Sequence, residues 1–102
     1  MPITVVLQNI DGTRRLNSVI DSEGGLNKSL PIDDPSFPLL QYVDPYGNAV
    51  FNPKQMPQLL EELQLLVNQS SEEYSKRLLE RVQVLARECQ GANHLYLRFV
   101  GD

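Results

Sequence analysis

The sequence from Asn52 to Gly91, NPKQMPQLLEELQLLVNQSSEEYSKRLLERVQVLARECQG, has the pattern of two amphipathic helices joined by a polar break. At roughly 100° per residue, the apolar residues of the first part fall within an arc of about 120°, and those of the second part within about 140°. In order, these apolar residues are Met56, Leu59, Leu60, Leu63, Leu66 and Val67, and then Tyr74, Leu78, Leu79, Val82, Leu85, Ala86 and Cys89. The short break, residues 68–71, predicts an antiparallel helical hairpin in preference to one bent helix.

Helix-capping residues stand at the expected ends of both segments. Asn52 followed by Gln55 forms a capping box for the first helix, in which each side chain bonds the backbone N–H of the other residue. Ser70, or the serine after it, is expected to cap the second helix, with Glu73 completing a second box. Gly91 is the expected C-cap of that helix.

The N-terminal residues predict a β-hairpin. Residues 3–10 alternate between apolar and polar, and Asp11-Gly12 is a strong signal for a two-residue turn. With that turn, Ile3 would pair with Ile20 and Leu7 with Leu16. The predicted core face then holds Ile3, Val5, Leu7, Leu16, Ser18 and Ile20, and the outer face holds Thr4, Val6, Gln8, Ile10, Thr13, Arg15, Asn17 and Val19.

The middle of the chain is rich in proline, and six of the seven prolines lie between Pro31 and Pro57. Residues 39–43 and 48–51 could form a second, short hairpin around the turn Asp44-Pro45-Tyr46-Gly47, with Gly47 in the left-handed conformation of a bulge. The competing interpretation is one helical turn across residues 38–43. On either interpretation, residues 22–36 are irregular.

The last segment alternates strictly, so we expect a strand over residues 94–100 with Leu95, Leu97 and Phe99 facing the core. Together these elements predict one α+β domain over residues 1–102. It has two layers, an antiparallel sheet and an antiparallel helical hairpin on one of its faces, in the order ββ(ββ)ααβ.

Composition limits the class of protein. The 102 residues are 41% apolar and 22% charged, as in an ordinary globular domain. No apolar run approaches the roughly 18 residues of a membrane span. The start lacks the basic region and the cleavage site of a secretory signal, and Cys89 has no second cysteine to pair with. We therefore expect a cytoplasmic protein that is not bound to membranes, in which Cys89 fills the core.

The net charge of −4 comes from one segment. Residues 21–51 contain five acidic residues and one basic residue, and the rest of the chain contains eight of each. An acidic surface repels phosphate groups, so we expect no binding to nucleic acid. Asp33, Asp34, Asp44 and Tyr46 are the candidate residues for docking a basic protein partner. A solvated loop is the simpler interpretation, and a metal site is disfavoured because the spacing of a calcium-binding loop is missing.

A second candidate site lies on the predicted outer face of the sheet, where His94, Tyr96 and Arg98 occupy alternate positions. Histidine, tyrosine and arginine together could hold an anion or transfer a proton near neutral pH. An ordinary polar, solvent-facing strand explains the same three residues. We find no phosphate-binding loop, no metal-binding Cys/His spacing and no nucleophile motif, so the sequence indicates no cofactor and favours a protein that is not an enzyme.

Apolar residues also occur where the helices should face solvent. Leu65 lies opposite the apolar stripe of the first helix and Val84 lies off the stripe of the second. With Val6, Ile10 and Val19 on the predicted outer sheet face, they suggest an interface for a protein partner or for self-association, such as a homodimer.

Two segments carry a resemblance to known proteins: the Phe37-Pro38-Leu39-Leu40, Asp44-Pro45-Tyr46-Gly47-Asn48 and Phe51-Asn52 series, and the closing run of residues 94–102. Together they resemble a group of short uncharacterised bacterial proteins, over about the last two-thirds of the chain. The resemblance implies a bacterial, cytosolic origin and brings no activity, ligand or site.

The leading functional hypothesis is a small non-catalytic module that docks a protein partner or itself. The second hypothesis is a small-molecule or anion site, with or without catalysis, which uses His94, Tyr96 and Arg98. The third is an immunity- or antitoxin-like inhibitor whose acidic residues cover a basic enzyme surface. The second hypothesis requires that its three side chains converge in one cleft.

Overall fold

The structure is a computed structural model that describes residues 3–9, 11–12, 15–21, 26, 29–44, 46–92 and 94–101. Its strands are β1 (Thr4–Asn9), β2 (Arg15–Ile20), β3 (Asn48–Phe51) and β4 (Leu95–Val100). Its α-helices, α2 (Met56–Gln69) and α3 (Glu73–Gln90), follow one another along the chain. Two short 3-10 helices, η1 (Leu40–Tyr42) and η2 (Pro53–Gln55), flank β3.

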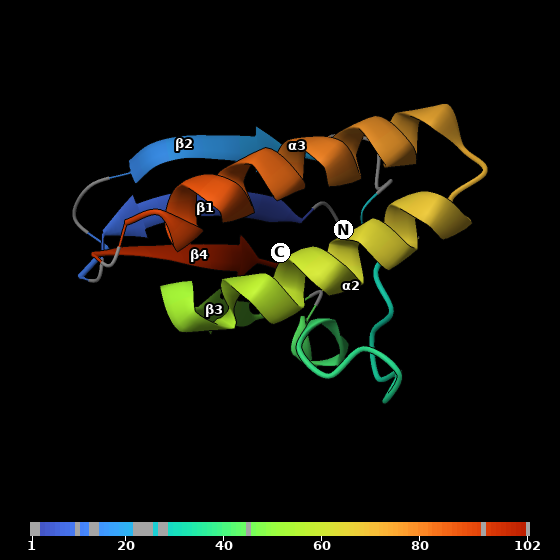
Figure 1. Ribbon diagram of the computed structural model, residues 1–102, viewed down its shortest axis with the longest axis horizontal. Helices are drawn as coiled ribbons and strands as arrows, with labels where there is room; N and C mark the ends of the chain where they lie inside the picture. The colour runs from blue at the N-terminus through green and yellow to red at the C-terminus, as the bar shows by residue number, and fades with distance from the viewer. Residues whose placement is uncertain are drawn as a thin grey trace.

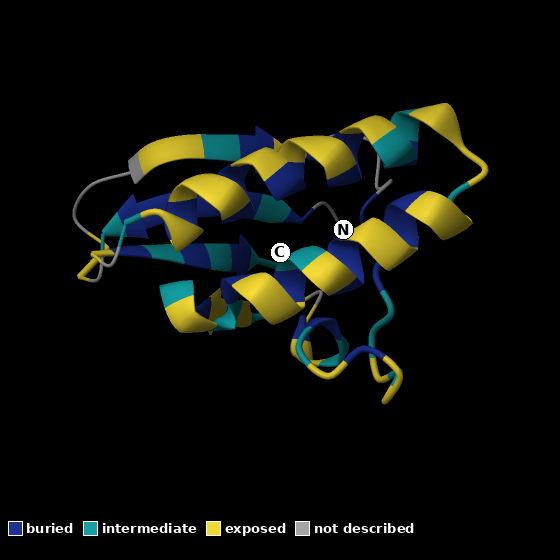
Figure 2. Cartoon of the chain, viewed as in Figure 1, coloured by how far each residue is buried: buried dark blue, intermediate teal, exposed yellow. Residues whose placement is uncertain are grey.

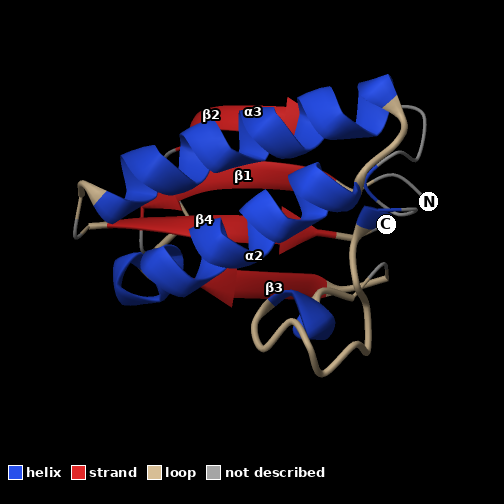
Figure 3. Ribbon diagram, turned by 45° about the vertical axis from the view of Figure 1, so that its right-hand side comes forward, coloured by secondary structure: helices blue, strands red, loops and turns tan. Residues whose placement is uncertain are grey.

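The strands form a four-stranded antiparallel sheet in the order β2-β1-β4-β3. Both α-helices lie on the same face of this sheet, and they run antiparallel to one another (Figures 1 and 3). The C-terminal strand β4 pairs with β1 on one side and β3 on the other, so it lies inside the sheet as predicted. The predicted α+β class and the two-layer arrangement are therefore confirmed.

The core lies between the two helices and the inner face of the sheet. Leu63 of α2, Leu85 of α3 and Leu97 of β4 are all buried there. In Figure 2, the buried residues of both helices face the sheet and the exposed residues face the viewer. The predicted helical stripes are thus the buried ones, while Leu65 and Val84 are exposed, as their positions off the stripes indicated.

The register of β1 with β2 differs from the predicted one. Val5 pairs with Val19 and Leu7 with Asn17, and a bulge between Leu7 and Gln8 restores the predicted pairing only at Gln8 and Arg15. The bulge is the cause, because it inserts Leu16 into β2 between Arg15 and Asn17 and shifts every later pair by one residue. Nearer the turn, the N–H of Gly12, whose φ is +75°, donates to the carbonyl of Asn9.

This one-residue shift exchanges the faces of β2, as any odd slip of a strand does. Val19, predicted on the outer face, is buried in the core. Leu16 and Ile20, predicted in the core, are 47% and 63% exposed. The predictions for Ile10 and Thr13 fall outside the described residues.

The predicted second hairpin is wrong. Residues 40–42 form the 3-10 helix η1, so the competing interpretation of a helical turn is the better one, and β3 pairs with β4 instead of with residues 39–43. The chain does turn over residues 44–47, where the N–H of Gly47 donates to the carbonyl of Asp44. Gly47 is not left-handed, because Gly12 is the glycine with positive φ among the described residues.

The two predicted capping boxes had different outcomes. Asn52 and Gln55 form theirs, with reciprocal bonds of 2.8 and 3.1 Å, although it caps η2 and the α-helix begins at Met56. The box at Ser70 is absent, since α3 begins at Glu73 without a side-chain cap. The Ser70 hydroxyl donates instead to the backbone carbonyl of Glu72, because Ser70 lies too far before the first helical turn.

Candidate functional site

The chain from Pro31 to Val43 is a series of tight turns closed by backbone hydrogen bonds. The N–H of Asp34 donates to the carbonyl of Pro31, and Asp33, the third residue of that turn, has a φ of +63°. Asparagine and aspartate tolerate this left-handed conformation better than most residues do. The N–H of Asp33 then donates to the carbonyl of Gln41 at 3.0 Å, which brings the two ends of the segment together.

A buried carboxylate on α2 fixes this segment to the core. Glu62 is almost fully buried, and its Oε1 accepts the backbone N–H groups of Leu40 at 2.9 Å and Leu39 at 3.1 Å. The amide of Gln58 donates to Oε2 at 2.9 Å. A buried carboxylate is tolerated when its acceptor positions are used in this way. The turn segment is therefore held against α2 by Glu62.

Asp44 holds the next turn. Its Oδ1 accepts the N–H of Tyr46 at 2.8 Å. The carboxyl group also lies over the backbone of Gly47, where a Cβ atom would come within 2.9 Å of Asp44 Oδ2. Position 47 therefore needs a residue without a side chain if Asp44 is to keep this orientation.

These turns enclose a surface hollow of about 420 Å³, which we call the tyrosine–aspartate hollow. Three of the four residues predicted to bind a partner, Asp33, Asp44 and Tyr46, line this hollow together, and Asp34 does not. Asp34 instead accepts the N–H of Ser36. The full lining is Ile32, Asp33, Gln41, Tyr42, Val43, Asp44 and Tyr46.

The chemistry of the tyrosine–aspartate hollow suits a cation. Tyr42 and Tyr46 are 71% and 73% exposed, and Asp33 and Asp44 are exposed beside them. An aromatic ring attracts an ammonium or guanidinium group through its negative face, and a carboxylate can accept its hydrogen bonds. Tyrosine also supplies a large contact area at a small cost in side-chain entropy.

The second predicted site is not gathered into one cavity. His94 lines a hollow with Asn9, Leu16 and Leu95, whereas Tyr96 lines a different one with Asn52, Pro53 and Lys54. Arg98 lies further along β4, opposite Val6 and Val50. Within the part of the chain that is described, these three residues share no hollow, which was the requirement for an anion site.

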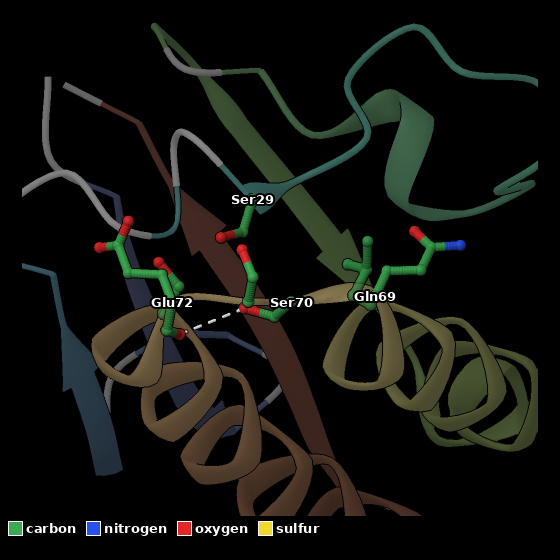
Figure 4. A pocket seen from close by; sticks show the side chains of 7 residues that line it. Ser29, Gln69, Ser70 and Glu72 are labelled. Atoms are coloured by element: carbon green, nitrogen blue, oxygen red, sulfur yellow. Dashed lines mark hydrogen bonds between the residues drawn. The ribbon is translucent and has the colours of Figure 1, made fainter.

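Another hollow, of about 300 Å³, lies beside the connection between α2 and α3 (Figure 4). Ser29 lies across it from the connection, and the Ser70 hydroxyl is directed to the backbone carbonyl of Glu72. Sequence reasoning missed this hollow because Ser29 is far from Ser70 in the chain and belongs to no motif. Its serine hydroxyls and its carboxylate make it polar, but they do not select one class of ligand.

Two important residues were not predicted from the sequence: Tyr42, which lines the tyrosine–aspartate hollow, and Glu62, which supports it from α2. Tyr42 lies between Leu40 and Val43, both buried, and in a helical turn this spacing directs the residue between them to solvent. The helical interpretation of residues 38–43 could therefore have identified it. Glu62 follows Leu59 by three residues and precedes Leu63, so its place beside the apolar stripe indicated burial, although nothing in the sequence indicated which groups it would bond.

Clusters of metal ligands and membrane-spanning helices are both absent from the described residues. Among them, no group of three or more His, Cys, Asp or Glu side chains is placed to hold a metal ion. Of the described helices, none is both long enough and apolar enough to cross a membrane.

In comparisons with known proteins, the chain matched no family model, no curated protein and no solved structure.

Proposed function

We propose that this chain is a small protein-interaction module, and that the tyrosine–aspartate hollow docks a partner protein through a basic side chain. The observation that carries the proposal is the convergence of two exposed tyrosines and two aspartates on one hollow of about 420 Å³. Aromatic residues that are exposed and grouped in this way are typical of protein interfaces, where tyrosine is enriched among the residues that contribute most to binding.

The support beneath the hollow favours binding by a preformed surface. Asp33 is tied to Gln41, Asp44 is tied to Tyr46, and Glu62 anchors the segment between them. A site whose backbone is already fixed loses less conformational entropy on binding. The concentration of acidic residues in residues 21–51 adds long-range attraction for a basic partner.

The residues of the hollow indicate which side chain of the partner would bind there. A lysine or arginine side chain of the partner would lie against Tyr42 or Tyr46, with its charged end at Asp33 and Asp44. An immunity- or antitoxin-like inhibitor is one form that such a module can take, with a basic enzyme surface as its partner. The same residues would carry that function.

The experiment is affinity capture from a native lysate with the immobilised chain and two variants. The test variant combines D33N and D44N. Asparagine also tolerates the left-handed conformation at position 33, and its side-chain oxygen can still accept the hydrogen bond at position 44. The matched control is D34N, which removes one carboxylate outside the hollow. We expect the wild type and the control to retain the same protein, and the double variant to lose it.

Salt and competition give a second readout. Raising the salt from about 0.1 to 1 M shortens the Debye length from about 10 to 3 Å, so a contact between exposed charges should weaken. A short peptide of alternating glycine and arginine should release the retained protein, and its glycine–glutamate counterpart should not. Retention of the same protein by the double variant would overturn the proposal.

A further inference from the structure

We infer that the open edge of β2 pairs with β2 of a second copy of this chain, in an antiparallel dimer with one continuous sheet. Among the described strands, β2 is an edge strand that pairs with β1 alone, and helix α3 lies over its face (Figures 1 and 3). The opposite edge strand, β3, is four residues long, and short edge strands are a common protection against pairing. Strand β2 is six residues long, and beyond its bulge residues 17–20 pair regularly with β1.

The composition of β2 also leaves the edge open. Residues 16–20, Leu-Asn-Ser-Val-Ile, contain no charged residue and no proline, the residues that usually block pairing between edges. Leu16 and Ile20, the exposed apolar residues found in place of predicted core residues, both belong to this segment. The bulge lies at Leu16, which has no partner on β1, so the regular part of the strand is residues 17–20.

Backbone geometry identifies which groups face the edge. In an antiparallel pair, the N–H groups of successive residues point alternately to the partner strand and away from it. The N–H of Asp21 donates to Ile3 of the neighbouring chain segment, so the N–H groups of Ile20 and Ser18 point to the open edge. In agreement with this, the N–H of Ser18 donates to the exposed side chain of its neighbour Asn17.

The second copy is preferred over a foreign strand because β2 is complementary to itself. In a joined sheet with both helical layers on the same side, the two-fold axis is perpendicular to the sheet. Residues that face each other across this axis then have side chains on the same face, so their numbers are both even or both odd. Pairing through the edge-facing residues then places Ser18 opposite Ser18 of the other copy, and Asn17 opposite Val19. Ile20 and the bulged Leu16 lie at the two ends of this paired segment, and no like charges meet within residues 17–20.

Helix α3 extends the same surface. A hollow of about 150 Å³ lies between β2 and α3, and it is lined by Ser18, Val19, Arg81, Val84 and Leu85 together with Asn17. Val84 is exposed at this hollow. A strand added beside β2 would lie next to it and cover its apolar side chain, while Arg81, also exposed, can extend its charged end to solvent.

The test is the molar mass in solution, measured by light scattering on size-exclusion fractions at protein concentrations up to about 1 mM. We expect the wild type to approach twice the monomer mass as its concentration rises. The variants S18K and S18E each place two like charges at the two-fold axis, so each should be monomeric. An equimolar mixture of the two should regain the dimer mass, because opposite charges then meet.

The control is V50K, a charge placed on the other edge strand at a residue that is also exposed, and it should leave the dimer intact. Circular dichroism checks that each variant is folded. If S18K is not folded, I20K replaces it. A monomeric I20K would support the inference, and a dimeric I20K would overturn it. Exchange of the Ile20 amide with deuterium should slow at least tenfold from dilute to concentrated protein.

A wild type that stays monomeric at about 1 mM would overturn the inference. So would a dimer that survives both S18K and S18E, or one that is lost in V50K as well. None of these results depends on the tyrosine–aspartate hollow, so the dimer and the proposed function can fail separately.

Discussion

The side chain of Glu62 accepts the backbone N–H of Leu40 at 2.9 Å, and it thereby joins the middle of α2 to the start of η1. The two residues belong to segments that no local sequence pattern connects. Because Glu62 is almost fully buried, this contact both satisfies a carboxylate and fixes the turns that carry Asp33, Tyr42 and Asp44.

The variant E62Q should therefore destabilise the fold. An amide has one acceptor oxygen, so if that oxygen keeps the bonds from Leu39 and Leu40, its NH₂ group would face the side-chain amide of Gln58, which donates to the carboxylate now. The expected cost is about 1–3 kcal/mol. Denaturant unfolding measures this free energy, and E61Q, a change at the exposed neighbour, serves as the control. Equal stability of E62Q and E61Q would contradict the role given to Glu62.

Substitutions of Asp33 should affect the stability of the fold and the binding of the partner in different ways. Because φ is +63° there, alanine should be less stable than glycine by about 1–2 kcal/mol. Both D33A and D33G remove the carboxylate, so both should weaken partner capture to a similar extent. Thermal unfolding of the two variants gives the comparison, and equal melting temperatures would mean that the backbone conformation at Asp33 is different.

Alanine at position 47 should change binding more than stability. The added Cβ would meet Asp44 Oδ2 at 2.9 Å, and the end of that side chain can move aside at small cost. We expect G47A to lower the free energy of unfolding by less than about 1 kcal/mol, while the displaced carboxylate weakens capture of the partner. A variant that binds as well as the wild type would show that the orientation of Asp44 is unimportant.

The thiol of Cys89 should remain unreactive in the folded protein. Burial raises its pKa from 9.0 to about 11, and the thiol lies 3.5 Å from the carbonyl of Leu95. A thiol-specific reagent at pH 8 should react at the rate of unfolding, because the thiolate is the reactive form. Rapid reaction under native conditions would contradict the buried position.

The same shift predicts a pH dependence of stability. The folded state holds the Cys89 proton more tightly than the unfolded state, so this contribution is complete below pH 9. It should fall by about 1.4 kcal/mol per pH unit as the pH rises toward 11. Since other groups titrate in this range, the measurement is the difference between the wild type and C89A, which should shrink over those two pH units.

Periodicity predicted the elements that depend on one-sided burial. The stripes of α2 and α3 and the alternation of β4 were correct because each places its apolar residues on one face, where tertiary contacts agree with the local pattern. The register of β1 with β2 was wrong because a bulge at Leu16 shifts the pairing by one residue beyond Gln8 and Arg15, and no local pattern marks that bulge. A shift of one residue moved Val19 into the core and Ile20 to the surface.

The candidate site was predictable in its residue types but not in its shape. Local acidity identified Asp33 and Asp44, and their convergence depends on the hydrogen bond from Asp33 to Gln41 and on the contact of Glu62 with η1. Neither contact has a signature in the sequence. The same tertiary contacts exclude Asp34, whose side chain serves its own turn with Ser36.

The decisive measurement is the dissociation constant of the captured partner for three forms of the chain: the wild type, D34N, and D33N combined with D44N. The account predicts that D34N binds within about twofold of the wild type and that the double variant binds at least tenfold more weakly, about 1.4 kcal/mol. Equal dissociation constants for all three forms would contradict the claim that the tyrosine–aspartate hollow is the docking site.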